Sequence, residues 1–227
     1  MQLIRPAKIW MALGVCYFGS LIWAAHFFPR PYDWRRDVIS SLASPRDNPH
    51  AYGIACSGLA VSGLLLIGLI GGLQQRLGPD ASGWSGWAGK LFLVGAVFLI
   101  LSALVVPGHY RVLGVGRSHE HLAQISGVAF CLSLLLYLGV VLRLPRTPPW
   151  FRCIAIVLVI IPVTALVTSR LSLVFAYELL SSTTYQLVKH SLWNSAALWE
   201  WVGAACIYLF LGLMLWLPPH SDSMGRT

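Results

Sequence analysis

Four ionisable residues are the strongest candidates for chemistry in this sequence: Asp37, His121, His190 and Glu200. His121, His190 and Glu200 lie inside or next to a long apolar segment, where an ionisable side chain is costly and usually faces a cavity or a partner, and Asp37 lies in the connection after the first apolar run. A histidine can act as a general base near neutral pH, and a neighbouring carboxylate can orient it. We therefore predict that these four residues supply the catalytic groups of a site if the protein is an enzyme, a question that the sequence leaves open.

The segment after the first apolar run alternates arginine and aspartate. It reads FFPRPYDWRRDVISSLASPRDNPH, and its middle predicts a short interfacial helix. One interpretation is an amphipathic loop helix that aromatic residues anchor at the membrane surface. The other is a lipid-headgroup or substrate contact through Arg35, Arg36 and Asp37. In an enzymatic version Ser40 or Ser41 would be the nucleophile or hydrogen-bond donor.

The stretch before the last apolar run has the densest polar pattern. Gln186, His190 and Asn194 recur at helical spacing, and Lys189 and Glu200 fall on an adjoining face. We predict that Gln186, Lys189 and Asn194 bind substrate. Glu200 would lie inside the last span, so it needs a partner there. The predicted partners are Lys189, the arginine near the end of the fifth span, or an arginine of the first connection. A structural ion pair without catalysis is the alternative.

Two histidines, His109 and His121, flank the connection before the fourth apolar run. His121 and Gln124 are three residues apart at the start of a helix, and we predict that His121 projects into the bundle. His119 is two residues from His121 and so points to a different side. His109 is a predicted substrate-binding residue. Three imidazoles with a carboxylate would suit zinc and a pair would suit haem, but no spacing motif supports either. The sequence thus predicts no metal site and leaves the cofactor unknown.

Long apolar runs must position all of these residues. With 57% hydrophobic and 11% charged residues, the chain of 227 residues is too apolar for an ordinary soluble domain. Six runs reach the length of about 20 residues that crosses a bilayer. They cover residues 9–28, 52–74, 88–107, 121–142, 151–170 and 194–217. We predict an all-α fold, a single integral membrane domain over residues 1–227. It is a polytopic bundle of six transmembrane helices with both termini on the same side.

Most acids and histidines gather at the end of this bundle opposite the termini. Six of the eight acids and six of the seven histidines lie there. They are Asp33, Asp37, Asp47, Glu120, Glu178, Glu200, His26, His50, His109, His119, His121 and His190. Lysine and arginine are equally divided, eight on each side, so their count does not orient the chain. The first basic residues, Arg5 and Lys8, favour cytoplasmic termini in the plasma (inner) membrane.

The composition also limits the kinds of molecule that we expect the chain to bind. The net charge of +8 does not indicate nucleic-acid binding, because the basic residues are spread singly over short loops. The five cysteines lie in apolar runs without a Cys-x-x-Cys motif and predict small hydrophobic side chains. We expect membrane lipids as partners and no nucleic acid. A membrane-protein partner or a homo-oligomer is the further candidate.

Several short motifs resemble a known family. They are Tyr32-Asp33 followed by residues 39–42 (Ile-Ser-Ser-Leu), His121-Leu122 at the start of the fourth helix, and Gln186 with a tryptophan-rich last helix. In this order they resemble the bacterial membrane family named domain of unknown function 998. The resemblance implies a compact multi-helix membrane domain with a polar pocket on its outer face and no established reaction. More distantly, the chain is similar to membrane proteins of the Frag1/DRAM/Sfk1 type, some of which are linked to lipid-anchor remodelling.

Three functions from different classes fit these observations. The first is a protein that binds, or binds and modifies, a lipid or lipid-linked headgroup at the outer face, because guanidinium groups at headgroup depth match phosphate chemistry. The second is a haem- or metal-binding electron-transfer subunit with His121 and His190 as ligands. The third is a structural or accessory subunit that packs against other membrane proteins through its ten tryptophans and small-residue helix faces.

Overall fold

The computed structural model describes residues 4–78, 82–105, 118–179 and 195–217. These residues form helices and connections, with no β-strand among them. Within these residues, five helices are long and apolar enough to cross a membrane, and a shorter apolar helical segment covers Pro149–Thr164. The prediction of an all-α polytopic membrane bundle is confirmed.

The first span is continuous but not uniform. It consists of α1 (Ile4–Gly14), a π-helical turn (Val15–Gly19) and α2 (Ser20–His26). A π turn inserts one residue into the helical ladder and often occurs where a helix must fit a neighbour or a site. Here it lies where the span packs against α4: a Cβ added at Gly58 would collide with the side chain of Ser20. The glycine therefore permits the close approach of the two helices.

The next helices follow the apolar runs. They are α4 (Tyr52–Leu77), α5 (Ser82–Leu104), α6 (Ser118–Arg143), α7 (Pro149–Leu179) and α9 (Ala196–Leu215). The predicted ranges agree with these bounds to within a few residues, except that α5 begins six residues earlier than predicted, and α7 ends nine later (88 − 82 = 6; 179 − 170 = 9). The start of α5 and the end of α7 therefore continue beyond the apolar runs into the polar flanks.

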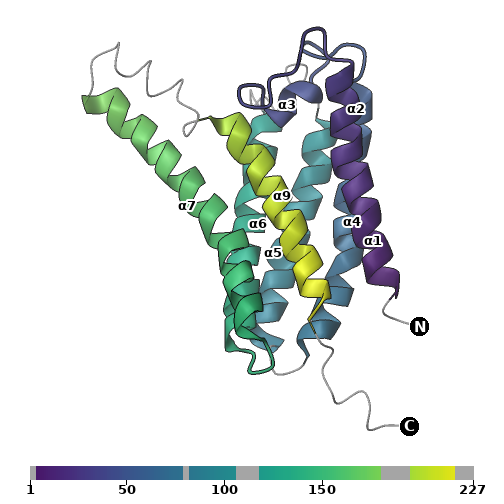
Figure 1. Ribbon diagram of the computed structural model, residues 1–227. Helices are drawn as coiled ribbons and strands as arrows, with labels where there is room; N and C mark the ends of the chain where they lie inside the picture. The colour runs from purple at the N-terminus through teal and green to yellow at the C-terminus, as the bar shows by residue number, and fades with distance from the viewer. Residues whose placement is uncertain (1–3, 79–81, 106–117, 180–194, 218–227) are drawn as a thin grey trace.

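The spans run side by side, and the described ends of the chain lie together (Figure 1). The indole Nε1 of Trp10 in α1 donates to the carbonyl of Tyr208 in α9 at 2.9 Å, and the two rings stack. The connection from α2 to α4 covers the opposite end of the bundle and includes the short helix α3 (Ile39–Leu42). The second half of α7 leans away from the other helices (Figure 1). Pro162 lies inside α7, where a proline removes one helical hydrogen bond and favours a bend.

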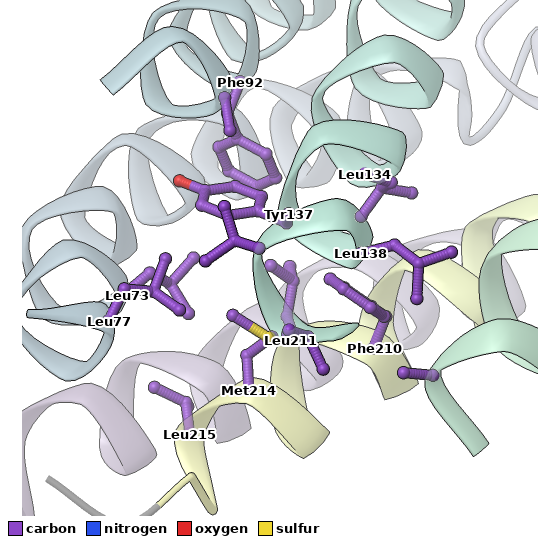
Figure 2. Packing of buried hydrophobic residues seen from close by; sticks show 14 of the residues in the cluster. Leu73, Leu77, Phe92, Leu134, Tyr137, Leu138, Phe210, Leu211, Met214 and Leu215 are labelled. Carbon is purple, nitrogen blue, oxygen red and sulfur yellow. The ribbon is translucent and has the colours of Figure 1, made fainter. Parts of the chain in front are cut away.

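Two apolar clusters fill the bundle. The larger one lies toward the termini, and Figure 2 shows Tyr137 of α6 packed there with Phe92 of α5 and the leucines of α4 and α9. The smaller one joins α2, α3 and α4 beneath the connection, and includes Leu21 and Leu42. Serine hydroxyls add hydrogen bonds between helices: Ser133 of α6 donates to the carbonyl of Ala88 in α5 at 2.7 Å. In lipid, such small polar contacts help to hold neighbouring helices.

Candidate functional site

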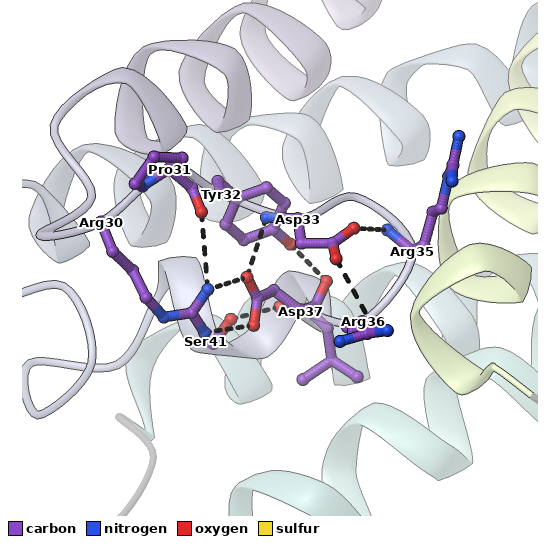
Figure 3. A network of polar contacts seen from close by, with 9 residues as sticks. Arg30, Pro31, Tyr32, Asp33, Arg35, Arg36, Asp37 and Ser41 are labelled. Atoms are coloured by element: carbon purple, nitrogen blue, oxygen red, sulfur yellow. Dashed lines mark hydrogen bonds and ion pairs between the residues drawn. The ribbon is translucent and has the colours of Figure 1, made fainter. Parts of the chain in front are cut away.

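An ion pair between Arg30 and Asp37 organises the connection that covers the end of the bundle (Figure 3). The two guanidinium nitrogens donate to the two carboxylate oxygens at 2.8 and 2.6 Å. The same carboxylate accepts from the backbone N–H of Asp33 at 2.9 Å. The Asp37 side chain is 12% exposed, whereas that of Arg30 is 58% exposed. The Arg30 guanidinium holds the pKa of Asp37 below its usual value, although partial burial acts in the opposite direction.

The residues around this pair form turns instead of the predicted interfacial helix. The N–H of Asp37 donates to the carbonyl of Asp33 at 2.8 Å, which closes a single turn. The Asp33 carboxylate accepts from the N–H of Arg35 at 3.0 Å and lies 3.7 Å from the Arg36 guanidinium. The side chain of Arg36 is 83% exposed, so this second ion pair is weak. Only residues 39–42 are helical, and the alternating charges mainly pair with one another.

The last helix holds this connection through its first turns. A carboxylate oxygen of Glu200 accepts from the backbone N–H of Ile39, the first residue of α3, at 2.8 Å. Ser195 caps α9 by accepting from the N–H of Leu198 at 3.2 Å, and its hydroxyl donates to the carbonyl of Arg35. Glu200 was predicted to meet a cation. The backbone N–H of the first connection is a partner that the sequence did not indicate.

Three aromatic rings reinforce the same contact. Trp34 and Trp201 meet edge to face with centroids 4.7 Å apart, and Tyr32 lies 5.0 Å from Trp34. The hydroxyl of Tyr32 donates to the carbonyl of Asp37 at 2.6 Å. Burial raises the pKa of Tyr32, and the charges of Asp37 and Glu200 act in the same direction. Tyr32 therefore stays protonated and serves as a hydrogen-bond donor. The predicted interfacial aromatics link the connection to α9.

An open hollow of about 490 Å³ lies in the outer surface of the connection. Three arginines, two aspartates, one serine and three apolar residues line it. They are Phe28, Pro29, Arg30, Arg36, Asp37, Val38, Ser41, Arg46 and Asp47. Arg46 is exposed, and no carboxylate among the described residues lies within ion-pair distance of it. The Ser41 hydroxyl donates to the carbonyl of Val38 at 2.6 Å. The arrangement offers guanidinium donors to a ligand at the membrane surface.

The structure brings only some of the predicted site residues to this hollow. Asp37, Arg36 and Ser41 line it, whereas Arg35 is exposed and Ser40 is half-buried outside the lining. Five further predicted site residues lie outside the described residues: His109, Gln186, Lys189, His190 and Asn194. Whether these five residues approach the hollow therefore stays a prediction.

The predicted direction of His121 is wrong. His121 is exposed, and it is His119 that turns inward in the first turn of α6. The Nδ1 atom of His119 lies 2.8 Å from the carbonyl oxygen of Ser102 and 3.0 Å from that of Val105. Both partners are acceptors, so Nδ1 must carry the hydrogen and donate to the last turn of α5. His119 thereby joins the end of α5 to the start of α6.

Sequence reasoning did not indicate the roles of Arg30, Arg46 and Asp47. Arg30 and Asp37 are seven residues apart, which is two turns of a helix, but the segment between them is not helical, so helical periodicity does not explain their contact. The Pro29 and Pro31 that flank Arg30 were the available signal, because prolines restrict the backbone and favour a fixed turn. In the described part of the chain, no group of three or more histidine, cysteine, aspartate or glutamate side chains is arranged to hold a metal ion. The predicted pairing of His121 with His190 extends outside that part and is not tested.

Comparison with known protein families gives a match over most of the chain. A family model described as "Protein of unknown function (DUF998)" matches residues 11–217. No curated protein and no solved structure matches the chain.

Proposed function

The chain belongs to the DUF998 family of membrane proteins of unknown function, and we propose that it binds the phosphate-bearing headgroup of a lipid or lipid-linked molecule in the hollow over α3. The observation that supports this most is the set of three guanidinium groups, from Arg30, Arg36 and Arg46, around one open hollow. Arginine is well suited to phosphate because its planar donors match two oxygens at once.

The charges of the hollow favour an anion. Its three arginines and two aspartates leave a net charge of +1 (3 − 2 = 1). Arg30 is engaged with Asp37 by two short hydrogen bonds, and Arg36 approaches Asp33 only at 3.7 Å. The guanidinium groups of Arg36 and Arg46 are therefore the ones most accessible to a ligand. We assign the phosphate to these two, with Arg30 and Asp37 fixing the shape of the wall.

The position of the hollow favours a lipid over a soluble anion. The hollow lies in the connection directly after the first span, which ends at His26, and before α4, which begins at Tyr52. This is the level at which headgroups meet helix ends. Phe28, Pro29 and Val38 supply an apolar part of the lining beside the charged one. A ligand with a phosphate and an adjoining hydrocarbon chain would use both. With cytoplasmic termini, the hollow would face the outer leaflet of the plasma membrane.

Binding is better supported than catalysis. The lining contains one serine, and its hydroxyl donates to a main-chain carbonyl. The nine lining residues include no histidine that could act as a general base for it. The enzymatic role of His121 and His190, the haem- or metal-binding alternative and the role as an accessory subunit stay predictions from the sequence.

Neighbouring arginines provide a matched test of the proposal. The full chain, purified into phosphatidylcholine nanodiscs with a small fraction of phosphatidic acid, would be examined by native mass spectrometry for bound phosphatidic acid. Arg36→Gln and Arg46→Gln should each lower the bound fraction by about threefold to tenfold, the effect of losing one partly exposed charge-assisted hydrogen bond. Arg35→Gln removes the same charge outside the lining and should leave binding unchanged. Equal retention of phosphatidic acid in all four proteins would refute the proposed site.

A further inference from the structure

The termini end of the bundle carries a second basic surface, separate from the hollow. The cations described there belong to α1, to the first half of α5, to the adjoining ends of α4, α6 and α7, and to the connection between α6 and α7. They are Lys8, Arg76, Lys90, Arg143, Arg146 and Arg152. Every carboxylate whose side chain the structure describes lies at the other end, on the connection or on the first turns of α6 and α9. This surface therefore has no described internal counter-charge.

Three of these cations stabilise the fold through hydrogen bonds to main-chain carbonyls. Arg76 donates to the carbonyl of Leu217 at 2.7 Å, and Arg146 donates to the carbonyl of Arg76 at 2.7 Å. Arg152 donates to the carbonyl of Leu144 at 2.9 Å. The last carbonyls of a helix lack helical partners and carry partial negative charge, so these arginines complete helix ends. Lys8, Lys90 and Arg143 have no comparable main-chain contact among the described residues.

Lys90 and Arg143 are each held against an exposed tryptophan. The ammonium of Lys90 lies 4.6 Å from the ring centroid of Trp87, and the guanidinium of Arg143 lies 4.6 Å from that of Trp84. Trp84 and Trp87 are 51% and 63% exposed. Trp84, Trp87 and Lys90 follow one another at three-residue spacing, so they share a face of α5, and Arg143 reaches this face from α6. Cation–π contact orients both side chains and leaves their charge available.

The position and orientation of the Lys90 side chain indicate a ligand at the membrane surface. Lys90 lies about two turns inside the span that begins at Gly83, where its charge would be costly in hydrocarbon. Its contact with Trp87, one turn nearer the helix start, turns the ammonium toward the membrane surface. Trp84 and Trp87 belong to the residue type that gathers at headgroup level. The two cations therefore meet the bilayer where lipid phosphates lie.

An exposed apolar stripe continues from these residues toward the bilayer centre. Val94, Val97 and Leu101 are 40%, 38% and 39% exposed and fall at helical spacing after Lys90 on α5. An acyl chain whose phosphate lies at Lys90 and Arg143 would run along this stripe. The surface thus offers both parts that a phospholipid needs, a cationic end and an apolar track.

We propose that the face of α5 and α6 formed by Trp84, Trp87, Lys90 and Arg143 binds an anionic phospholipid in the leaflet at the termini end. The phosphate contacts the ammonium of Lys90 and the guanidinium of Arg143. This site lies at the opposite end of the bundle from the hollow and does not depend on the function proposed for it.

Charge variants of the full chain in mixed nanodiscs test the site. Phosphatidylglycerol would be titrated into phosphatidylcholine, and bound phosphatidylglycerol would be counted by native mass spectrometry. Lys90→Gln and Arg143→Gln should each reduce the preference of the chain for phosphatidylglycerol over phosphatidylcholine by about fivefold, which is the effect expected for one cation near an anionic surface. Lys8→Gln removes one charge at the same end but away from α5 and α6, and should change the preference by less than twofold. An equal loss in Lys8→Gln would show a diffuse surface effect and overturn the site.

A second measurement needs no substitution of Lys90 or Arg143. Brominated lipids quench the fluorescence of tryptophans that they contact. The part of the quenching that comes from these two tryptophans is the difference between the wild-type chain and the Trp84→Phe/Trp87→Phe double variant. This difference should be greater with brominated phosphatidylglycerol than with brominated phosphatidylcholine. Arg36→Gln and Arg46→Gln should leave this difference unchanged, which separates the two proposals. Equal quenching by the two lipids would refute specific binding of an anionic lipid here.

Discussion

Asp37→Asn tests whether the ion pair with Arg30 holds the connection in place. The substitution keeps the shape of the side chain and one acceptor oxygen but removes the charge and the second acceptor. Two charge-assisted hydrogen bonds, at 2.8 and 2.6 Å, lose their anion. A buried bond of this kind contributes about 1.5–3 kcal/mol, whereas an exposed ion pair contributes at most about 1 kcal/mol. With Asp37 12% exposed and Arg30 58% exposed, we expect a local cost of about 1–2 kcal/mol.

Hydrogen exchange measures this cost directly. The N–H of Asp33 donates to the Asp37 carboxylate, so its exchange should be about fivefold to thirtyfold faster in Asp37→Asn, as a cost of about 1–2 kcal/mol implies. Asp47→Asn is the control, because it removes the same charge from the same hollow but from an exposed residue without an ion pair among the described residues. If both variants exchange like the wild-type chain, the ion pair does not stabilise the connection.

The lowered pKa of Asp37 gives the same prediction a pH dependence. A carboxyl whose pKa is lower in the folded state stabilises that state at pH values above its ordinary pKa of 3.8. The contribution is lost as the pH falls below 3.8 and through the lower folded value. The protection of the Asp33 amide from hydrogen exchange should therefore be constant from neutral pH to about pH 5. The Asp47→Asn variant, measured at each pH, is the reference for this comparison. A loss of protection already near pH 6 would contradict this assignment.

Two further substitutions test contacts at the same end of the bundle. Glu200→Ala should destabilise the docking of α9 on α3 by about 1–3 kcal/mol, because the N–H of Ile39 loses its acceptor. Glu200→Gln should restore part of the lost stability, and both effects can be measured by thermal unfolding and by hydrogen exchange of the Ile39 amide. An unchanged Ile39 amide in Glu200→Ala would show that the contact is not formed. His119→Ala should lower thermal stability by about 1–3 kcal/mol because a buried side chain and its hydrogen bonds to the end of α5 are lost, while His121→Ala should have little effect. The reverse order of the two histidines would show that the sequence-based direction of His121 was correct.

The spans were predictable because the bilayer imposes a simple requirement on them. Each must present about 20 apolar residues and satisfy its own main-chain hydrogen bonds, and both properties are visible in the sequence. The bounds of α4 and α9 are accordingly within three residues of those predicted. Of the site residues predicted from the sequence, Arg36, Asp37 and Ser41 line the hollow, and their role in binding stays a prediction.

The rotation of a membrane helix about its axis is harder to predict. In α6 the exposed residues and those packed against other helices are both mainly apolar, so no polar face marks the outside. His119 and His121 were therefore equally good candidates for the inward position, and the sequence-based choice of His121 was wrong. The connection was harder still, because the approach of Arg30 to Asp37 and of Glu200 to Ile39 depends on turns and on helix docking, not on a repeating pattern.

Binding of a phosphate in the hollow over α3 can be observed directly. The most direct measurement is a side-chain-resolution density map of the full chain in phosphatidylcholine nanodiscs that contain phosphatidic acid. We predict lipid density whose phosphate lies within ion-pair distance of Arg36 and Arg46, and which is absent from the map of Arg36→Gln/Arg46→Gln. A hollow without lipid density in the wild-type map, at a resolution that shows lipids elsewhere around the bundle, would contradict phosphate binding at this site.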